Sequence, residues 1–170
     1  RDIGVTGVQT CALPISERFQ HRLIYASMEL AKEKGACDKF DETKYADGEM
    51  PIDHYKSDLD ELVKPIYHQD WESLRHLVRE FGMRNSTLTA QMPSESSSVV
   101  CNATNGVEPP RDYLSVKKSK KGTLKQIVPS YGTLKNNYTL LWEMGSMDGY
   151  LNIMAVIQKF FDQAISTNTS

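Results

Sequence analysis

The sequence is short of the features that mark several large classes of protein. It has only three cysteines among 170 residues, Cys11, Cys37 and Cys101, and their spacing matches no metal-binding motif. It has 20 lysines and arginines against 22 acidic residues, so it lacks the basic excess of nucleic-acid-binding proteins. It has no apolar run near the roughly 20 residues that cross a bilayer. These absences predict a cytoplasmic protein with reduced thiols, and they argue against nucleic acid or a membrane as its partner.

What the sequence does contain fits a globular protein. Hydrophobic residues make up 39% of the chain, which is enough for one domain with a core. A fragment of a larger domain would have the same composition.

The first sixteen residues stand apart from the rest. RDIGVTGVQTCALPIS, Arg1 to Ser16, has neither a helical nor an alternating period, and it lacks the long apolar core of a signal peptide. Its run VTGVQTCALPI resembles one reading frame of a common DNA-sequencing adapter. We therefore interpret residues 1–16 as a non-native scar, in which case Cys11 is not a biological thiol and the natural protein extends further upstream. The alternative is a short native strand with a Leu-Pro turn.

Two segments in the first half of the chain have strong helix signals. Residues 16–34 carry apolar side chains at helical spacing, and Gly35 ends the pattern. Residues 70–81 form the best-marked helix, because Asp70 can accept from the free N–H groups at its start and Gly82 can take the left-handed conformation at its end. The apolar residues that recur in the first helix are Phe19, Leu23, Ala26 and Leu30. The residues expected on the buried face of the second helix are Leu74, Leu77, Val78 and Phe81.

The rest of the chain predicts shorter elements. Residues 113–118 and 123–128 predict a β-hairpin joined through Lys120-Lys121-Gly122. Its lysines could form a phosphate-binding patch, but charge at a hairpin tip is more typical of protection against pairing with other chains. The other predicted elements are a short helix over residues 51–64 capped by Asp53 and ended by Pro65, a buried strand over 84–92, a short helix over 98–104, a helix over 131–143, and a final helix with Asp148 as cap and apolar residues around most of its circumference.

The segment QMPSESSSVVCNATNG, Gln91 to Gly106, places small hydroxyl side chains between a predicted strand and a predicted helix. A helix start presents unpaired N–H groups and a partial positive charge, so such a place can hold an anion. Ser94, Ser96 and Ser97 would add short donors, without a Walker lysine or a glycine-rich loop. The alternative is that the serines only cap the helix, and residue chemistry alone favours that alternative.

Other candidate residues carry weaker signals. Glu95 could act as an acid or base, although a carboxylate beside a phosphate more often faces solvent or bonds to a ribose or a neighbour. Cys101 could be a nucleophile near a helix start, but the adjacent Val99-Val100 predicts that it is a buried small residue. The four histidines are scattered and define no catalytic triad: His21, His54, His68 and His76.

Two stretches are similar to a known family. WESLRHLVREFGMRNSTLTAQMPSESSS, followed by NATNGVEPP, resembles the large (alpha) subunit of class I ribonucleoside-diphosphate reductase. The supporting similarity covers residues 17–170, through YASMELAKEKGAC, FDETKYADG, PIDHYKSDLDE, LKQIVPSY, LLWEM and QKFFDQAISTNT. The resemblance implies an α/β fold in which residues 17–170 are an incomplete C-terminal portion of the family's ten-stranded catalytic barrel.

The resemblance also implies an activity and a site. The family reduces ribonucleoside diphosphates to deoxyribonucleoside diphosphates for DNA synthesis through a thiyl-radical mechanism. Ser94, Glu95, Ser96 and Ser97 match the family segment that binds the substrate's diphosphate at a helix start. Ser96 stands where relatives often have threonine, which keeps the hydroxyl group. We expect these four residues to bind substrate, and we expect neither a metal site nor a catalytic residue in this chain.

The partners implied for the intact enzyme follow from the same resemblance. They are the small (beta) subunit, which supplies the radical from a metal-containing cofactor, thioredoxin or glutaredoxin, ATP and dNTP effectors, and a second alpha subunit. Cys37 and Cys101 do not occupy the positions of the family's catalytic cysteines. We therefore expect a cofactor-free fragment that is inactive alone. The alternative, from a different class, is a stand-alone α/β module that binds a phosphorylated ligand without catalysis.

Overall fold

The computed structural model describes residues 13–62, 64, 66–94, 96–119 and 122–167. This part of the chain divides into two compact units, the first with residues 13–91 and 149–165 and the second with residues 92–148 and 166–167. Unit 1 contains helices α2 (Leu13–Lys34), α3 (Leu59–Leu62), α4 (Trp71–Phe81) and most of α7 (Asp148–Gln158), with 3-10 turns at Phe40–Glu42 and Pro51–Asp53. Unit 2 contains helices α5 (Ser96–Val100) and α6 (Tyr131–Leu134), strands β1 (Leu114–Ser119) and β2 (Gly122–Ile127), and 3-10 turns at Lys135–Asn137 and Leu141–Glu143.

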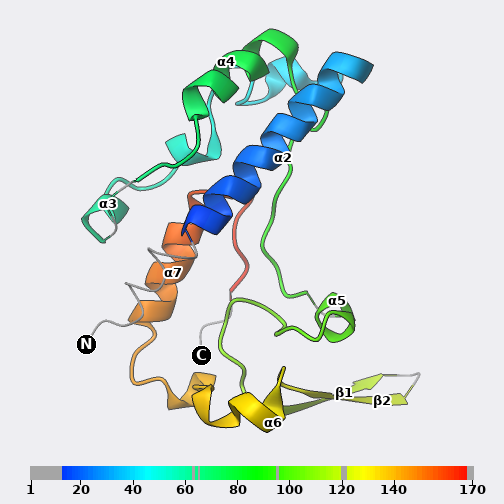
Figure 1. Ribbon diagram of the computed structural model, residues 1–170, viewed down its shortest axis with the longest axis vertical. Coiled ribbons are helices and arrows are strands. Elements are labelled where there is room, and N and C mark those ends of the chain that lie inside the picture. The colour runs from blue at the N-terminus through cyan, green and yellow to red at the C-terminus, as the bar shows by residue number, and fades with distance from the viewer. Residues whose placement is uncertain (1–12, 63, 65, 95, 120–121, 168–170) are drawn as a thin grey trace. The chain divides into compact units, whose positions relative to one another are not determined.

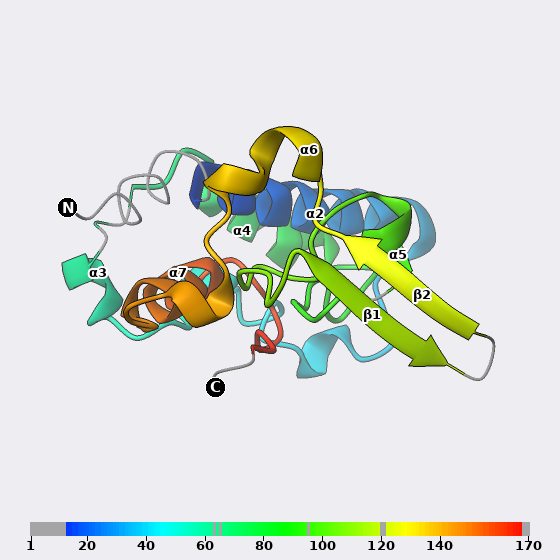
Figure 2. The ribbon, with the colours of Figure 1, turned by 90° about the horizontal axis from the view of Figure 1, so that it is seen from below.

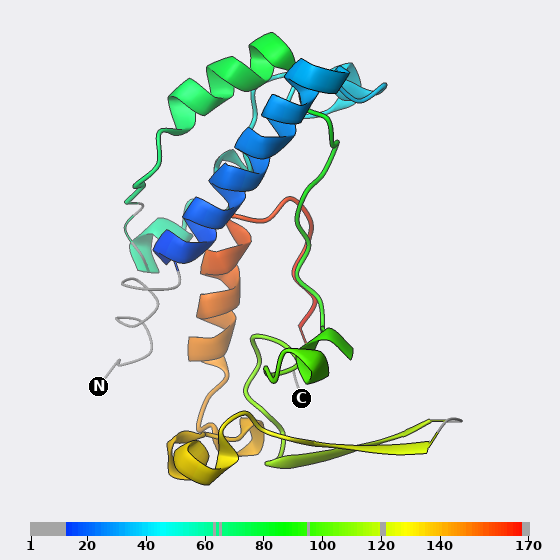
Figure 3. The ribbon, with the colours of Figure 1, turned by 45° about the vertical axis from the view of Figure 1, so that its right-hand side comes forward.

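Helices α2 and α4 lie side by side in unit 1 and run in the same direction (Figure 1, Figure 3). Near the start of α4, the ring of Trp71 meets His21 edge to face, with 5.2 Å between centroids. At its end, the ammonium group of Lys32 lies 4.3 Å from the centre of the Phe81 ring. The core around this pair consists of Ile24, Met28, Tyr45, Met50, Ile52, Trp71, Leu74, Val78, Met83 and Phe160.

The predicted ends of α4 are confirmed. Asp70 is its N-cap, and the Asp70 carboxylate accepts from the N–H of Ser73 at 3.0 Å. Gly82 has a φ of +75° and donates its N–H to the carbonyl of Val78 at 2.8 Å. Leu74 and Val78 are buried as predicted. Local chemistry therefore sets both ends of this helix.

The helix predicted over residues 16–34 is confirmed as α2, but the apolar stripe in its sequence is not its buried face. Phe19 and Leu30 are 56% and 39% exposed, whereas the opposite face of the helix is buried. That buried face mixes apolar with polar side chains, in the order Glu17, Gln20, Ile24, Ser27, Met28 and Ala31. The polar members can be buried because hydrogen bonds satisfy them. The apolar spacing in the sequence therefore marks a stripe of apolar side chains along α2. This stripe is not the face that packs on the core of unit 1.

Glu17 shows how a charged residue can be buried on that face. It is 1% exposed, and its carboxylate accepts from the backbone N–H groups of His68 and Gln69 at 2.8 and 2.9 Å and from the indole N–H of Trp71 at 3.1 Å. Ser27 is held in a similar way, because its hydroxyl donates to Asn85 and accepts from the Asn85 N–H, both at 3.0 Å. These bonds replace the hydration that burial removes.

The strand predicted over residues 84–92 is absent from the described part of unit 1. The segment is coil with bends at Arg84 and Ser86, and among its described residues only Gln91 makes a bridge, a single parallel one to Ile165. The N–H groups of Leu88 and Thr89 bond instead to the carboxylate of Asp162, at 2.7 and 3.1 Å. The backbone N–H groups of this segment are thus satisfied by a carboxylate side chain, whereas in a sheet a neighbouring strand would accept them.

Two predicted helices are broken into turns. The span 131–143 is one turn of α6, a 3-10 turn, an extended stretch at Tyr138, and a second 3-10 turn. Glycine and two adjacent asparagines in this span disfavour a continuous helix. The span 51–64 holds only a 3-10 turn and α3, and Asp53 accepts from the N–H of Met50 at 2.7 Å instead of capping a long helix.

The hairpin predicted in unit 2 is confirmed, and Figure 2 shows its two strands side by side. β1 and β2 pair antiparallel from Leu114↔Ile127 to Ser119↔Gly122. The turn residues Lys120 and Lys121 lie outside the described residues, as do residues 1–12 with Cys11. α2 already begins at Leu13, within the segment interpreted as a scar, and that interpretation stays a prediction. None of the described helices is long and apolar enough to span a membrane.

Candidate functional site

The serine loop, residues 94–97, lies in unit 2 and leads into α5. Ser96 and Ser97 form the first turn of this five-residue helix, which begins two residues earlier than predicted. Glu95 lies outside the described residues, so its predicted contact with substrate stays a prediction.

Backbone hydrogen bonds hold the serine loop at both ends. The N–H of Ser94 donates to the carbonyl of Asn105 at 2.7 Å, and the N–H of Ser97 donates to the carbonyl of Ser94 at 3.0 Å. Beyond α5, the chain turns at Asn102, whose φ is +49°, and Ala103 donates back to the carbonyl of Ser98 at 2.9 Å. The NATNG stretch thus returns the chain to the start of the loop.

The loop presents its hydroxyl groups to solvent. Ser94, Ser96 and Ser97 are exposed, while Ser98 is buried. Among the described residues, the hydroxyls of the three exposed serines form no hydrogen bond, so none of them caps α5 through its side chain there. The backbone N–H groups of Ser94 and Ser97 already have acceptors, and the donors left for an anion at these two residues are therefore their hydroxyls.

The prediction that Cys101 is buried is wrong. Cys101 is an exposed free thiol, and Val100 beside it is 86% exposed. α5 is too short to press a continuous face onto a core, so the apolar neighbours do not bury the cysteine. Cys37, in unit 1, is a half-buried free thiol.

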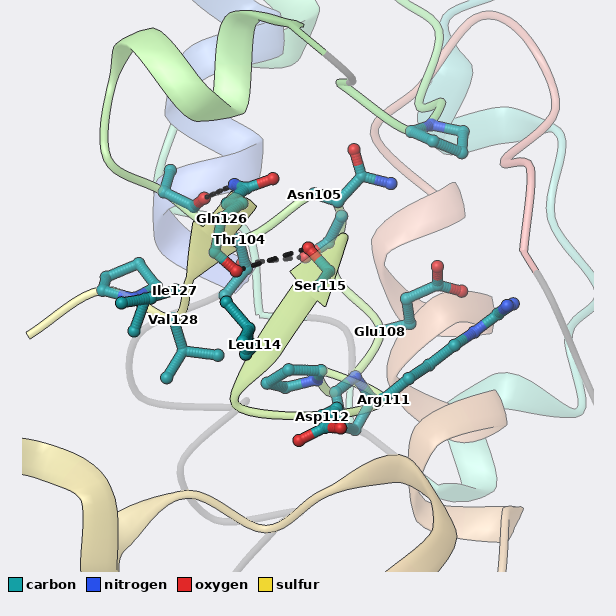
Figure 4. A pocket seen from close by; sticks show the side chains of 16 residues that line it. Thr104, Asn105, Glu108, Arg111, Asp112, Leu114, Ser115, Gln126, Ile127 and Val128 are labelled. Atoms are coloured by element: carbon teal, nitrogen blue, oxygen red, sulfur yellow. Dashed lines mark hydrogen bonds between the residues drawn. The ribbon is translucent and has the colours of Figure 1, made fainter. Parts of the chain in front are cut away.

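A pocket of about 400 Å³ lies next to the loop within unit 2 (Figure 4). Asn105, whose carbonyl holds Ser94, is one of its lining residues. Figure 4 shows Ile127 and Val128 on one side of the pocket and Glu108 and Arg111 on the other. Sequence reasoning missed this pocket because Asn105-Gly106 and Pro109-Pro110 were only recognised as breakers, which predict a change of direction but not what the turned chain encloses.

Charged residues elsewhere form ion pairs and no metal site. In the described ranges, no three histidine, cysteine or acidic side chains gather closely enough to bind a metal ion. In unit 1, Lys159 is 3% exposed, pairs with Asp60 at 2.6 Å, and lies 3.8 Å from the centre of the Tyr55 ring. The hydrogen bond from Lys159 holds the pKa of Asp60 below its usual value. This cluster links α7 to α3 and was not predicted, because a single lysine in an apolar helix gives no spacing signal.

Comparison with known proteins identifies the family of this chain. The model of the ribonucleotide reductase barrel domain matches residues 9–135, which include the serine loop and the hairpin. The chain is 60% identical over 154 residues to the ribonucleoside-diphosphate reductase subunit alpha of Haemophilus influenzae and 56% identical over 154 residues to the ribonucleoside-diphosphate reductase 1 subunit alpha of Escherichia coli. It is 44% identical over 155 residues to the ribonucleoside-diphosphate reductase subunit alpha of Enterobacteria phage T4. These matches cover 90–91% of the chain and 20–21% of each relative. The chain spans about a fifth of the length of these relatives, and it belongs to the ribonucleotide reductase family as part of the alpha-subunit barrel domain.

Proposed function

We propose that this chain supplies the diphosphate-binding loop of a ribonucleoside-diphosphate reductase. The observation that carries the proposal is a loop of exposed hydroxyls, at Ser94, Ser96 and Ser97, that have no hydrogen-bond partner among the described residues. The loop lies inside the stretch matched to the reductase barrel domain. Hydroxyls that donate to a phosphate form charge-assisted hydrogen bonds without adding a positive charge. Glu95 completes the set of four residues that the family resemblance assigns to substrate.

The whole enzyme would reduce ribonucleoside diphosphates to deoxyribonucleoside diphosphates within a ten-stranded α/β barrel. Its thiyl radical and reducing cysteines would come from parts of the alpha subunit that this chain does not match, and thioredoxin or glutaredoxin would restore the cysteines. Its radical would originate in the beta subunit, and ATP or dNTP effectors would act on an alpha dimer. The role of this chain is to bind and orient the diphosphate, with no redox step of its own.

The proposal is tested by titrating the purified 170-residue chain with ADP and with inorganic pyrophosphate, following amide resonances by NMR. Replacing Ser96 and Ser97 together by alanine removes two charge-assisted donors, worth about 1.5–3 kcal/mol each, so ADP affinity should fall about 100-fold or more. Ser57 and Ser86 are exposed serines outside the loop, and replacing both by alanine is the matched control. Equal affinity of the loop variant and the control would reject the loop assignment.

A second measurement tests whether the chain carries out the reduction by itself. Mixed with a beta subunit, a dithiol reductant, effector and CDP, the chain should form no dCDP, because Cys37 and Cys101 do not match the family's catalytic cysteines. Deoxyribonucleotide formation above the level of a chain-free control would overturn this part of the proposal.

A further inference from the structure

One face of the β-hairpin in unit 2 exposes apolar side chains. In the register of β1 and β2, Leu114 lies opposite Ile127 and Val116 lies opposite Lys125. Because side chains alternate between the two faces of a strand, these four side chains share one face. Leu114, Val116 and Ile127 are 43%, 49% and 55% exposed. The half of this face at the base of the hairpin is therefore apolar and open to solvent.

Basic side chains follow the apolar ones toward the turn of the hairpin. Lys118 lies two residues beyond Val116 along β1 and opposite Thr123, so it belongs to the same face. Lys118 and Lys125 are exposed, and neither forms an ion pair with another described residue. From the base to the turn, each strand thus presents apolar side chains first and a lysine second.

Both outer edges of the hairpin are open among the residues that the structure describes. The sheet contains only β1 and β2 there, so each strand has one edge without a neighbouring strand. An open edge presents unpaired N–H and C=O groups, and an extended segment of another chain can join it as a further strand. A two-stranded hairpin is only marginally stable alone, so a third strand with apolar side chains on this face would stabilise it.

The charge of the face decides between possible occupants. Neither β1 nor β2 contains an acidic residue, so a second copy of the hairpin, paired edge to edge, could not neutralise Lys118 and Lys125. A lipid surface or a nucleic acid could neutralise the lysines, but neither supplies the backbone N–H and C=O groups that an open edge needs. An acidic strand satisfies the edge, the apolar side chains and the lysines together.

We propose that this face and its edges are a docking surface for an acidic, extended segment of another protein chain. The segment joins the hairpin as a further strand, with apolar side chains beside those at the base and a carboxylate beside Lys118 or Lys125. Side chains on one face of a strand are two residues apart, so the segment carries its apolar and acidic residues at every second position. The surface uses no residue of the serine loop, and its role does not depend on diphosphate binding.

The experiment titrates the full 170-residue chain with a heptapeptide and follows the amide resonances of β1 and β2 by NMR. The peptide has glutamate at both ends, two valines at the inner alternate positions and threonine between them, so it can pair in either direction. Binding should shift these resonances and slow hydrogen exchange along one outer edge. A peptide with lysine in place of both glutamates should bind about tenfold more weakly.

Variants of the chain test which side chains recognise the peptide. Lys118→Glu combined with Lys125→Glu should weaken binding of the glutamate peptide about tenfold or more, and should make the lysine peptide the tighter ligand. Lys56→Glu combined with Lys64→Glu, at exposed lysines of unit 1, is the charge-matched control and should bind the glutamate peptide like the original chain. Val116→Thr keeps a β-branched side chain on the face but removes apolar surface, so it should weaken binding several-fold.

The same titrations can overturn the proposal. Unchanged resonances of β1 and β2 at millimolar peptide would overturn it, and so would equal affinities for the glutamate and lysine peptides. A single-stranded oligothymidylate that binds the hairpin as tightly as the glutamate peptide would show that charge alone attracts ligands there. Because none of these variants alters the serine loop, failure of this proposal would leave the diphosphate assignment standing.

Discussion

The burial of Glu17 rests on the hydrogen bonds that its carboxylate accepts, so removing this carboxylate should be costly. Glu17→Leu would leave the N–H groups of His68 and Gln69 and the indole N–H of Trp71 without this acceptor. Each buried group left unpaired costs about 1–3 kcal/mol. We expect a loss of about 3 kcal/mol in the free energy of unfolding, measured by urea denaturation. Glu33→Leu, on an exposed position of the same helix, should change it by less than about 0.5 kcal/mol. Equal effects of the two substitutions would contradict a specific role of Glu17.

The burial of Glu17 also could not be predicted from residue patterns. Apolar spacing identified α2 as a helix, but the side chains that pack on the core of unit 1 include Glu17, Gln20 and Ser27. Their burial depends on donors and acceptors that arrive from residues 50 or more positions away, which no local pattern contains. The serine loop is proposed as a site from its own local residues, and that stays a prediction. The contacts of Asp162 could not be predicted, since its partners lie more than 70 residues earlier in the sequence.

At the scale of elements, the two glycines that end α2 and α4 should differ in how well they tolerate a side chain. Both have positive φ, +81° at Gly35 and +75° at Gly82. A Cβ at Gly35 would meet nothing within 4 Å, but one at Gly82 would lie 2.7 Å from the Cβ of Ala36. Gly35→Ala should cost about 1 kcal/mol from backbone strain. Gly82→Ala should cost about 1–3 kcal/mol more, because its ψ of −169° suits only glycine and because packed neighbours must shift. Thermal melts of both variants test this, and equal costs would contradict the expected difference.

The ion pair between Arg75 of α4 and Asp53 should make the free energy of unfolding depend on pH. Burial opposes the ionisation of Asp53, but the hydrogen bonds from Arg75, at 2.6 Å, and from the Met50 N–H outweigh it and hold the pKa of Asp53 below its usual value. The resulting stabilisation is present above the ordinary aspartate pKa of about 4 and is lost as pH falls through the lower folded-state pKa.

Asp53→Asn should therefore destabilise the chain at pH 7, by about 1 kcal/mol because the pair is partly exposed to solvent. The difference from the original chain should shrink as pH is lowered below about 4. Urea midpoints recorded across this pH range provide the measurement. Asp58→Asn, on an exposed residue of the next turn, should change the midpoint at pH 7 only slightly. A cost of Asp53→Asn that stays constant with pH would contradict the ion-pair explanation.

Elements with signals at both ends were predicted well, and elements that depend on distant partners were not. α4 has a cap and a stop in its own sequence, and the hairpin has matched strands, so both form as expected. The buried strand predicted over residues 84–92 does not form, because a strand needs a neighbour, and here a carboxylate and a single bridge take that place. The helix predicted over residues 131–143 does not form as one element, because its glycine and asparagines have poor helix propensity.

At the scale of the whole molecule, α2 carries two different faces. One packs on the core of unit 1, and the other presents Ile15, Phe19 and Leu30 to solvent, at 68%, 56% and 39% exposure. These residues recur at spacings of four and eleven, so they form one stripe along the helix. Phe19 and Leu30 belong to the apolar pattern from which the sequence predicts this helix. In the relatives, whose alpha subunits are about five times as long, further chain is available to cover such a stripe.

This exposed stripe should make the isolated chain associate with itself. Phe19→Lys combined with Leu30→Lys places charges on the stripe without touching the buried face of α2, so the double variant should shift from oligomers toward the monomer in sedimentation velocity. Ile66→Lys combined with Val100→Lys is charge-matched, at sites 67% and 86% exposed and away from the stripe, and it should associate like the original chain. A cooperatively melting monomer of the original chain at high concentration would show that the stripe needs no cover, and would favour the stand-alone binding module over a piece of a larger barrel.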